Sequence, residues 1–248
     1  AFEPALLAAV GNWLAEHGPL TILALGMITS RNGWVEVPYV PCPATPADLA
    51  HAVVYRSLSD GTPILFLPGL TDPIGRPYPD VMRGEETQIV GYGLGRDTTL
   101  VLPGTHSKWA RVGQGRIQRF QTFVTGEIFA LLAQHSFIAK VAGGHSETFD
   151  WQAYDAGVRE AAEDRPEARA ALSLLFAART GMLAGKLAPT EIRDYVSGLL
   201  IGHEFAEAQS CGWFRDQDRI GIVGNDGLNA RYGRAARVFG LTVEDGGE

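Results

Sequence analysis

The chain has 248 residues, of which 46% are hydrophobic and 20% charged, which is typical of a globular protein with a substantial core. Its net charge of −7 argues against a general surface for nucleic acid or anionic membranes, although a local basic pocket is compatible with it. Cys42 and Cys211 lie far apart and belong to no disulfide or metal motif, so we expect the reducing cytoplasm. No apolar run reaches the roughly 18 residues that a membrane span needs.

The first part of the chain alternates between helical and strand patterns. Leu6, Leu7, Val10 and Leu14 recur at helical spacing. Glycine and proline punctuate the segments that follow. The predicted elements are a helix over 2–17, a strand over 21–27, a turn with a short extended piece over 31–43, a helix opening at 48–52, a strand over 63–70 and a helix over 83–94.

The pattern changes near Thr98, where three strand-like pieces follow one another. We therefore predict an N-terminal lobe over 1–95 and a C-terminal lobe over 96–248, both α/β. The elements predicted for the second lobe are strands within 98–104, 107–112 and 116–126, a helix over 127–136, a helical region over 150–210 split at Gly181, Gly185 and Pro189, a strand over 219–227 that enters a glycine turn, a helix over 228–240 and a last strand over 241–245.

The sequence VLPGTHSKWARV, residues 101–112, interrupts a strand pattern with polar residues. A tight hairpin that directs backbone N–H groups, hydroxyls and a lysine at one point can hold phosphate oxygens. Gly104 allows close approach, Thr105 and Ser107 add hydroxyls, and Lys108 either neutralises charge or points to solvent. A hairpin whose polar residues face water explains this segment equally well on its own. The spacing is not that of a P-loop.

Three further patterns suggest a site. IVGNDGLNARYG (222–233) is a strand that enters a glycine turn before a helix, where a base and ribose can lie close to the backbone, but it lacks the G-x-G-x-x-G spacing. MRGEETQ (82–88) sets two carboxylates beside an arginine, which could activate a hydroxyl or hold a hydrated metal. FVTGE (123–127) ends another strand. Taken singly, each has an ordinary structural explanation.

Taken together, five blocks in order over most of the chain resemble the 2-dehydro-3-deoxygalactonokinases. They are GMITSRNGWVEVPYVPCP (26–43), VMRGEETQIVG (81–91), VLPGTHSKW (101–109), FVTGEIFALL (123–132) and SGLLIGHEFA (197–206). The resemblance implies a two-lobed, actin-like ATPase fold (ribonuclease H-like) with the active site in the cleft between the lobes. It also implies transfer of the γ-phosphoryl of ATP, with Mg²⁺, to the 6-hydroxyl of 2-dehydro-3-deoxy-D-galactonate, a step of galactonate breakdown.

The resemblance assigns roles to single residues. Glu85 or Glu86 would act as a base or through a metal-bound water, and Arg83 could pair with the substrate carboxylate, since a planar fork suits that geometry. For Trp34 and Tyr39, core packing is the alternative to a substrate role. The residues assigned to the phosphates are Gly104, Thr105, His106, Ser107 and Lys108, those at the adenosine end are Gly224, Asn225 and Asp226, and those that shape the sugar-acid pocket are Ser30, Gly33, Trp34, Tyr39, Thr125 and Glu127. The metal ligands stay unassigned.

The sequence departs from this superfamily in one respect. Its kinases begin with a strand and an Asp-x-Gly-Thr/Ser turn that serves the metal and grips phosphate, and no such motif appears in this chain. The chain also stops at VEDGGE, before the family's closing small-residue helix. We therefore expect the sequence to be a portion of a longer polypeptide that lacks the first strands of lobe one, and a protein made from these residues alone to be inactive.

Several alternatives stay open. A kinase for the gluconate epimer differs at one hydroxyl stereocentre, which a single polar contact can distinguish. An exopolyphosphatase-like phosphohydrolase would use the glutamate to orient water and would release phosphate without a sugar. A non-catalytic nucleotide-binding protein would bind ATP without turnover. The expected partners are a small sugar acid and ATP, with no nucleic acid or membrane, and a homo-oligomer is compatible with the sequence.

Overall fold

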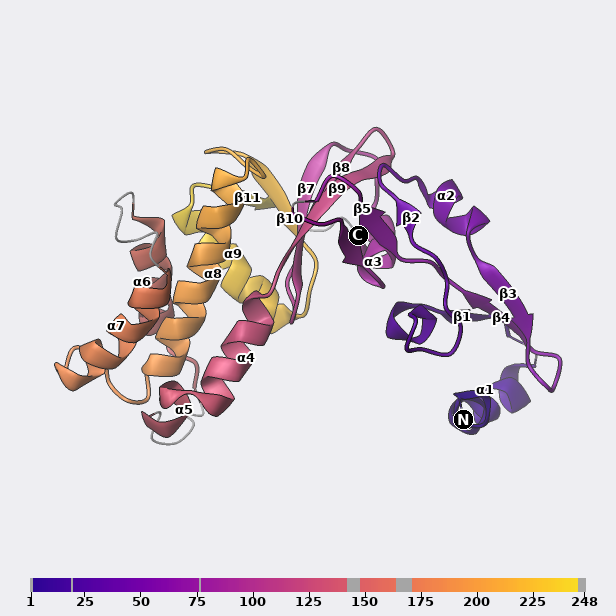
Figure 1. Ribbon diagram of the computed structural model, residues 1–248, viewed down its shortest axis with the longest axis horizontal. Helices are drawn as coiled ribbons and strands as arrows, with labels where there is room; N and C mark the ends of the chain where they lie inside the picture. The colour runs from indigo at the N-terminus through magenta and orange to yellow at the C-terminus, as the bar shows by residue number, and fades with distance from the viewer. Residues whose placement is uncertain (1, 19, 76, 142–147, 164–170, 245–248) are drawn as a thin grey trace. The chain divides into compact units, whose positions relative to one another are not determined.

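A computed structural model of the chain describes residues 2–18, 20–75, 77–141, 148–163 and 171–244 (Figure 1). The chain divides into two compact units. Unit 1 comprises Ala1–Asp97 and Val112–Gln121, and unit 2 comprises Thr98–Arg111 and Thr122–Glu248. Both contain helices and strands, so the predicted mixed α/β class is confirmed.

Unit 1 contains two small sheets. In the first, β1 (Ile22–Ala24) pairs in parallel with β4 (Pro63–Phe66), and β3 (Val54–Ser57) pairs with β4 in the antiparallel direction. Its buried face packs with Val37 and Leu58, and α1 (Phe2–His17) contributes Leu6 and Leu7 to the same cluster. The helical spacing at the start of the sequence therefore corresponds to a helix whose apolar face covers this sheet.

The second sheet has the order β2-β5-β6, formed by Val40–Pro41, Leu70–Asp72 and Asp80–Met82. Strand β2 is parallel to β5, and β6 is antiparallel to it. The sheet leads into α3 (Glu85–Tyr92), and α2 (Pro46–His51) lies between β2 and β3 in the sequence. Helix α2 begins at a capping box, in which Thr45 and Asp48 each accept a hydrogen bond from the other's backbone N–H.

Unit 2 is built on the sheet β11-β10-β7-β8-β9. Strands β7 (Thr98–Leu102), β10 (Arg219–Ile222) and β11 (Thr242–Glu244) are mutually parallel, and the apolar run Leu100–Leu102 is buried, as expected of a central strand. Strands β8 (Ser107–Gly113) and β9 (Arg116–Phe123) are joined by Gln114 and Gly115, both with positive φ, which is the geometry of a two-residue hairpin turn.

The turn end of this hairpin, residues 112–121, groups with unit 1. Ile117 forms a bridge with Ala44, and the Phe120 N–H donates to the buried Asp72 carboxylate over 3.0 Å. The chain thus runs from the connection after β7 along β8 into unit 1 and returns along β9. The hairpin is therefore a covalent link between the two units.

The helices of unit 2 gather around α8 (Figure 1). Helix α6 packs along α8 so closely that neither Gly157 nor Gly198 has room for a Cβ, because each faces a backbone carbonyl of the other helix. The helices of this unit are α4 (Thr125–His135), α5 (Phe137–Val141), α6 (Trp151–Ala162), α7 (Ala171–Leu183), α8 (Ile192–Ser210) and α9 (Asp226–Val238). Among the helices in the described ranges, none is long and apolar enough to cross a membrane.

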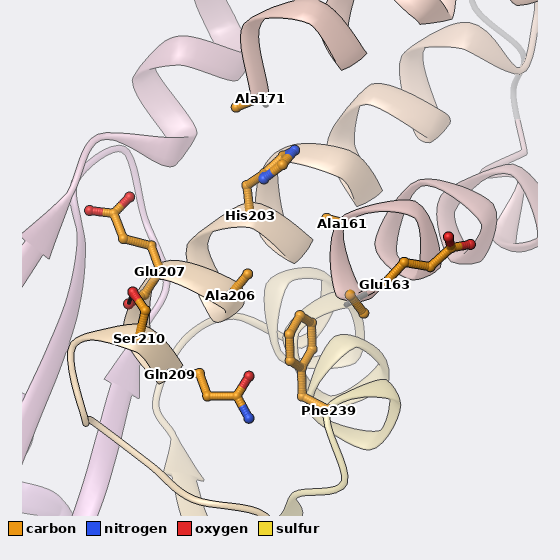
Figure 2. A pocket seen from close by; sticks show the side chains of 10 residues that line it. Ala161, Glu163, Ala171, His203, Ala206, Glu207, Gln209, Ser210 and Phe239 are labelled. Carbon is orange, nitrogen blue, oxygen red and sulfur yellow. Dashed lines mark hydrogen bonds between the residues drawn. The ribbon is translucent and has the colours of Figure 1, made fainter. Parts of the chain in front are cut away.

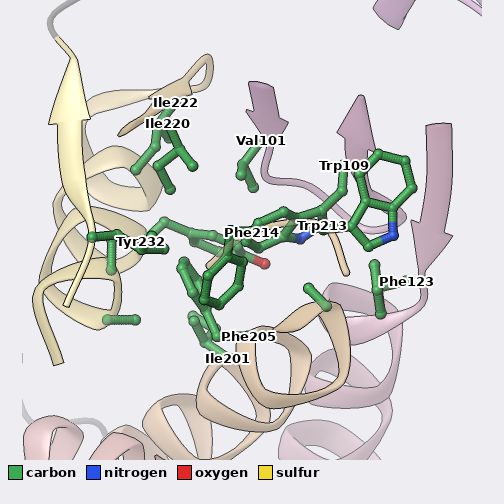
Figure 3. Packing of buried hydrophobic residues seen from close by; sticks show 14 of the residues in the cluster. Val101, Trp109, Phe123, Ile201, Phe205, Trp213, Phe214, Ile220, Ile222 and Tyr232 are labelled. Carbon is green, nitrogen blue, oxygen red and sulfur yellow. The ribbon is translucent and has the colours of Figure 1, made fainter. Parts of the chain in front are cut away.

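The main core of unit 2 lies between the sheet and helices α8 and α9 (Figure 3). Trp109 packs edge-on against Phe205, with ring centroids 5.0 Å apart, and stacks on Phe214 at 5.5 Å. Aromatic pairs at such distances add to the free energy gained by burying their area. This core fixes β8 and α8 relative to each other.

The structure corrects some predicted boundaries. The strand predicted over 21–27 ends at Ala24, because Gly26 adopts a positive φ and opens the 3₁₀-helix Gly26–Thr29. Strands β3 and β6 were not predicted, since β3 exposes most of its side chains and β6 has three residues. The helical region breaks after Leu183, where Gly185 and Pro189 lie, whereas the break predicted at Gly181 is wrong because this residue lies inside α7.

Candidate active site

The residues predicted to bind phosphate form the connection between β7 and β8 and the start of β8. This connection, Pro103–His106, is docked on the first turn of α4. The Glu127 N–H donates to the Thr105 carbonyl over 2.9 Å, and the Gly104 carbonyl lies where a Cβ on Gly126 would be. The two separate motifs PGTHSKW and FVTGE are therefore one structural unit.

The outer face of this connection is open. A Cβ added to Gly104 would meet no atom within 4 Å, and the side chains of Thr105 and His106 are exposed. His106 Nε2 and Glu127 Oε2 lie 2.7 Å apart, so these two half-exposed side chains form a pair beside the connection. Within the described residues this space at Gly104 is unoccupied, which leaves room for a ligand.

Ser107 and Lys108 are buried, with exposed fractions of 0% and 3%. Lys108 Nζ donates to the His106 carbonyl over 2.9 Å, so the side chain of this lysine does not point to solvent. Successive side chains of a strand lie on opposite faces, and Lys108 therefore faces away from Ser107 and Trp109. The ammonium group brings a positive charge to the base of the connection.

Behind the connection lies a carboxylate that the predicted site does not include. Glu204 of α8 is 3% exposed, and its Oε1 accepts hydrogen bonds from Ser107 Oγ at 2.7 Å and Trp109 Nε1 at 2.8 Å. Its Oε2 accepts one from Tyr232 Oη at 2.8 Å, and the Thr125 hydroxyl bonds to the same carboxylate. Burial raises the pKa of Glu204, while these donors act in the opposite direction. The sequence signal was present: a single glutamate in the apolar run of α8, within the block 197–206.

The predicted adenosine turn lies next to the predicted phosphate connection. Strands β7 and β10 are parallel neighbours with Val101 opposite Ile222, so both end at the same edge of the sheet. The Val223 N–H donates to the Val101 carbonyl over 2.9 Å, and a Cβ on Gly224 would lie 3.4 Å from the Pro103 ring. The tertiary structure thus brings together two segments that are more than 100 residues apart in the sequence.

Within this turn, Asn225 caps α9. Its Oδ1 accepts the Leu228 N–H at 3.0 Å, and Asn229 Nδ2 donates to the Gly224 carbonyl at 3.0 Å. Gly224, Asn225 and Asp226 are exposed. A helix N-terminus that begins at an open turn presents partial positive charge to whatever binds there.

The predicted catalytic residues belong to unit 1. The Arg83 guanidinium donates through Nη1 to Thr29 Oγ1 at 2.8 Å and through Nη2 to the Val37 carbonyl at 2.9 Å, and it lies 4.1 Å from the centroid of the Tyr39 ring. Its Nε is buried and has no hydrogen-bond partner among the described residues. Arg83 therefore ties the loop that carries Ser30, Gly33 and Tyr39 to the start of α3.

Glu85 and Glu86 both bind backbone N–H groups at the start of α3. Glu85 Oε2 accepts from the Arg83 N–H at 2.9 Å, and both oxygens of Glu86 accept from the Gly84 N–H at 2.9 and 2.8 Å. Glu86 is 1% exposed, and burial raises its pKa to about 7, whereas Glu85 is half-buried. A carboxyl with a pKa near neutrality is suited to exchange a proton with a hydroxyl.

The remaining predicted sugar-pocket residues of unit 1 show different surroundings. Ser30 Oγ donates to the Met27 carbonyl at 2.8 Å, and Gly33 has no room for a Cβ because the Ile28 carbonyl faces it. Trp34 packs edge-on against Phe66 at 5.4 Å and joins the core cluster of this unit. This packing accounts for the tryptophan without a substrate, and its role in the pocket stays a prediction.

A separate hollow of about 720 Å³ lies beside α8 in unit 2. Figure 2 shows His203, Glu207, Gln209 and Phe239 around it. Burial lowers the pKa of His203. No predicted site residue lines this hollow. As for metals, no group of three or more histidine, cysteine, aspartate or glutamate side chains within the described ranges is arranged to hold an ion.

Comparisons with known proteins identify the family of the chain. The family model described as 2-keto-3-deoxy-galactonokinase matches residues 1–247. A Rhizobium meliloti (strain 1021) protein assigned as a 2-dehydro-3-deoxygalactonokinase is 38% identical over 90% of this chain and 72% of its own length. The 2-dehydro-3-deoxygalactonokinase of Escherichia coli (strain K12) is 34% identical over 96% of this chain and 77% of its own length.

A solved structure resembles the chain over almost its whole length. The crystal structure of a Sinorhizobium meliloti protein assigned as a 2-dehydro-3-deoxygalactonokinase has a TM-score of 0.86 and 33% sequence identity, and the match covers 98% of this chain and 80% of that one. A family model that spans the chain, relatives above 30% identity and this structural match all point to one family. The chain belongs to the 2-keto-3-deoxy-galactonokinase family of kinases.

Proposed function

We propose that the protein transfers the γ-phosphoryl group of ATP to the 6-hydroxyl of 2-dehydro-3-deoxy-D-galactonate, giving 2-dehydro-3-deoxy-6-phosphogalactonate. The observation that carries this proposal within the fold is the juxtaposition of the connection Pro103–His106 with the turn Val223–Asn225 at one edge of a parallel strand pair. Ligands of open α/β sheets bind outside the carboxyl ends of the strands. The relatives' names supply the substrate.

In unit 2, Gly104, Thr105 and His106 would bind the phosphates through backbone N–H groups and exposed side chains. Lys108 would contribute charge from below, and the buried Ser107 would act through its backbone, because its hydroxyl is committed to Glu204. The adenosine end would lie against Gly224, Asn225 and Asp226. Phosphoryl transfer depends chiefly on positioning and charge neutralisation, which such an arrangement supplies.

In unit 1, Glu86 would accept the proton of the 6-hydroxyl, since its pKa of about 7 suits a base near neutral pH. Glu85 is the alternative, because it is less buried. The further N–H donors of Arg83 would face the sugar-acid carboxylate, and Ser30, Gly33, Trp34 and Tyr39 would contact the sugar acid from this unit. In unit 2, the residues with this proposed role are Thr125 and Glu127.

Mg²⁺ would neutralise phosphate charge during transfer. It is commonly held by one or two carboxylates together with substrate phosphates, so the adjacent pair Glu85 and Glu86 fits that requirement without a larger cluster. Both carboxylates lie in the first turn of α3. We further propose that the two units are the lobes of an actin-like kinase and that the protein acts in the cytoplasm, where its free thiols Cys42 and Cys211 would stay reduced.

The reaction is tested by ADP release from the full-length enzyme with ATP and Mg²⁺, comparing 2-dehydro-3-deoxygalactonate, its gluconate epimer and no sugar. We expect turnover with the galactonate compound and little without sugar. Faster turnover of the epimer would reassign the substrate, and phosphate release without sugar would indicate a hydrolase.

The nucleotide assignment is tested by Gly104→Val. The fold leaves open space at this Cβ, so the variant is expected to melt within a few degrees of the parent while its KM for ATP rises. The exposed Asp218→Asn provides a control, because Asp218 directly precedes β10 in the same unit, at the opposite end of the strand from the Val223–Asn225 turn. An unchanged KM for ATP in Gly104→Val would contradict binding at this connection.

A further inference from the structure

Glu204 of α8 is a buried carboxylate in unit 2 to which the proposed function assigns no role. Glu204 receives hydrogen bonds from Ser107, Trp109, Tyr232 and Thr125 and is 3% exposed. An ionised carboxylate offers about four acceptor positions and no donor. The four donors therefore fill the acceptor positions of the Glu204 carboxylate. Without this carboxylate, each donor would be a buried polar group that has lost a hydrogen-bond partner.

The donors come from three separate segments. Ser107 and Trp109 begin β8 directly after the predicted phosphate connection, and Thr125 is the first residue of α4, on which that connection is docked. Tyr232 lies in α9, the helix that begins at the predicted adenosine turn. One carboxylate on α8 thus joins the two segments that carry the predicted nucleotide residues of this unit and the start of α4, on which the connection Pro103–His106 is docked.

Side chains alternate between the two faces of a strand, so the hydrogen bonds of Ser107 and Trp109 to Glu204 also determine the direction of Lys108. Because Glu204 holds both Ser107 and Trp109 on one face of β8, the residue between them must point to the opposite face. Rotation of this part of the strand would break two hydrogen bonds to a buried carboxylate. The position of the Lys108 ammonium below the connection is therefore coupled to Glu204.

We infer that Glu204 is a positioning residue for ATP. It holds the connection Pro103–His106 with the start of β8, the start of α4 and helix α9 in the arrangement that receives the nucleotide. The inference rests on the proposed assignment of that connection to the ATP phosphates. Glu204 is buried behind the connection and acts through Ser107, Trp109, Thr125 and Tyr232 rather than by touching the substrate.

The test compares Glu204→Leu and Glu204→Gln in the full-length enzyme. Leucine removes every acceptor, and we expect the KM for ATP to rise about tenfold or more, since a buried donor left without a partner costs free energy on the scale of a tenfold change in an equilibrium. Glutamine keeps one oxygen for Ser107 and Trp109, while the hydroxyls of Tyr232 and Thr125 can rotate to accept from its amide. It should therefore rescue most of the loss. Glu207→Gln, an exposed glutamate on the same helix, is the matched control.

A second variant covers the case in which Glu204→Leu fails to fold. Tyr232→Phe removes one hydroxyl and leaves the aromatic packing in place. We expect it to raise the KM for ATP, because Glu204 then loses the hydrogen bond that joins it to α9. Lower melting temperatures with an unchanged KM for ATP in all of these variants would mean that Glu204 only stabilises the fold, and would overturn the inference.

The Gly104→Val variant separates this inference from the proposed function. If Gly104→Val raises the KM for ATP and the Glu204 and Tyr232 variants do not, the connection binds ATP and the positioning role is wrong. If Gly104→Val also leaves the KM for ATP unchanged, the phosphate assignment fails and the inference fails with it.

Discussion

Gly126, the second residue of α4, packs so tightly against the carbonyl of Gly104 that no Cβ fits between them. The two glycines therefore have opposite requirements. Gly126 is needed by the fold, whereas Gly104 faces open space, where a side chain would contact only a ligand. A contact between two motifs 22 residues apart thus explains the glycine at position 126, whereas the fold leaves room for a side chain at position 104.

The first prediction concerns Gly126→Ala. Alanine favours helices over glycine by about 1 kcal/mol, yet here the variant should lower the free energy of unfolding by about 1–3 kcal/mol, because its methyl group overlaps the Gly104 carbonyl. Gly181→Ala in α7 is the matched control, since its Cβ would meet only Leu187 at 3.9 Å. Denaturant unfolding of both variants measures the difference. A stabilised Gly126→Ala protein would contradict the close contact.

The second prediction concerns the pH dependence of stability at Glu86. Its pKa is raised from 4.5 to about 7 by burial, so the folded state binds a proton that the unfolded state releases between these values. The contribution of this group to the free energy of unfolding is therefore greatest below about pH 4.5 and falls as the pH rises through 7. The loss amounts to about 3 kcal/mol when complete.

Glu86→Gln removes this titration. We expect the stability of the variant relative to the parent to improve between pH 5 and pH 8, as measured by denaturant unfolding at both pH values. Glu85→Gln provides the control on the adjacent, less buried side chain. A difference between parent and Glu86→Gln that does not change with pH would show that Glu86 does not titrate in this range.

The third prediction concerns Arg83→Lys. The planar Arg83 guanidinium donates to the Thr29 hydroxyl and the Val37 carbonyl and also lies over the Tyr39 ring. A lysine ammonium has no planar group that can make all three contacts. We expect a loss of about 1–3 kcal/mol in the free energy of unfolding, together with a higher KM for the sugar acid, because the loop from Ser30 to Tyr39 would be held less firmly. Arg31→Lys, at an exposed position of the same loop, should change neither quantity. Parent-like stability in Arg83→Lys would argue that these contacts contribute little.

The fourth prediction separates the two explanations of Trp34. Its contacts with Phe66 and Phe2 indicate that Trp34→Phe should lower the free energy of unfolding by about 1–2 kcal/mol. If packing is its whole role, the KM for the sugar acid stays at the parental value. A rise of that KM beyond that seen for a Val54→Ala variant in the same cluster would instead assign Trp34 to the pocket.

The sequence by itself determined the order and type of most elements. Helix α1 follows from apolar spacing, and the strands after Thr98 follow from short apolar runs between turn residues. The five family blocks also identified the kinase family before any geometry was known, and the comparisons confirm it. These features are local, because a helical period, a turn residue or a motif is contained within a dozen neighbouring positions.

The tertiary structure alone decided which of these segments meet. Pairing of β7 with β10 places the Gly104 connection beside the Gly224 turn, across more than 100 residues that no spacing rule relates. Glu204 could be seen in the sequence as the one acidic residue of the block 197–206, but its four donors come from β8, α4 and α9. A buried carboxylate is stable only where such donors converge, and convergence depends on packing in three dimensions rather than on any local pattern.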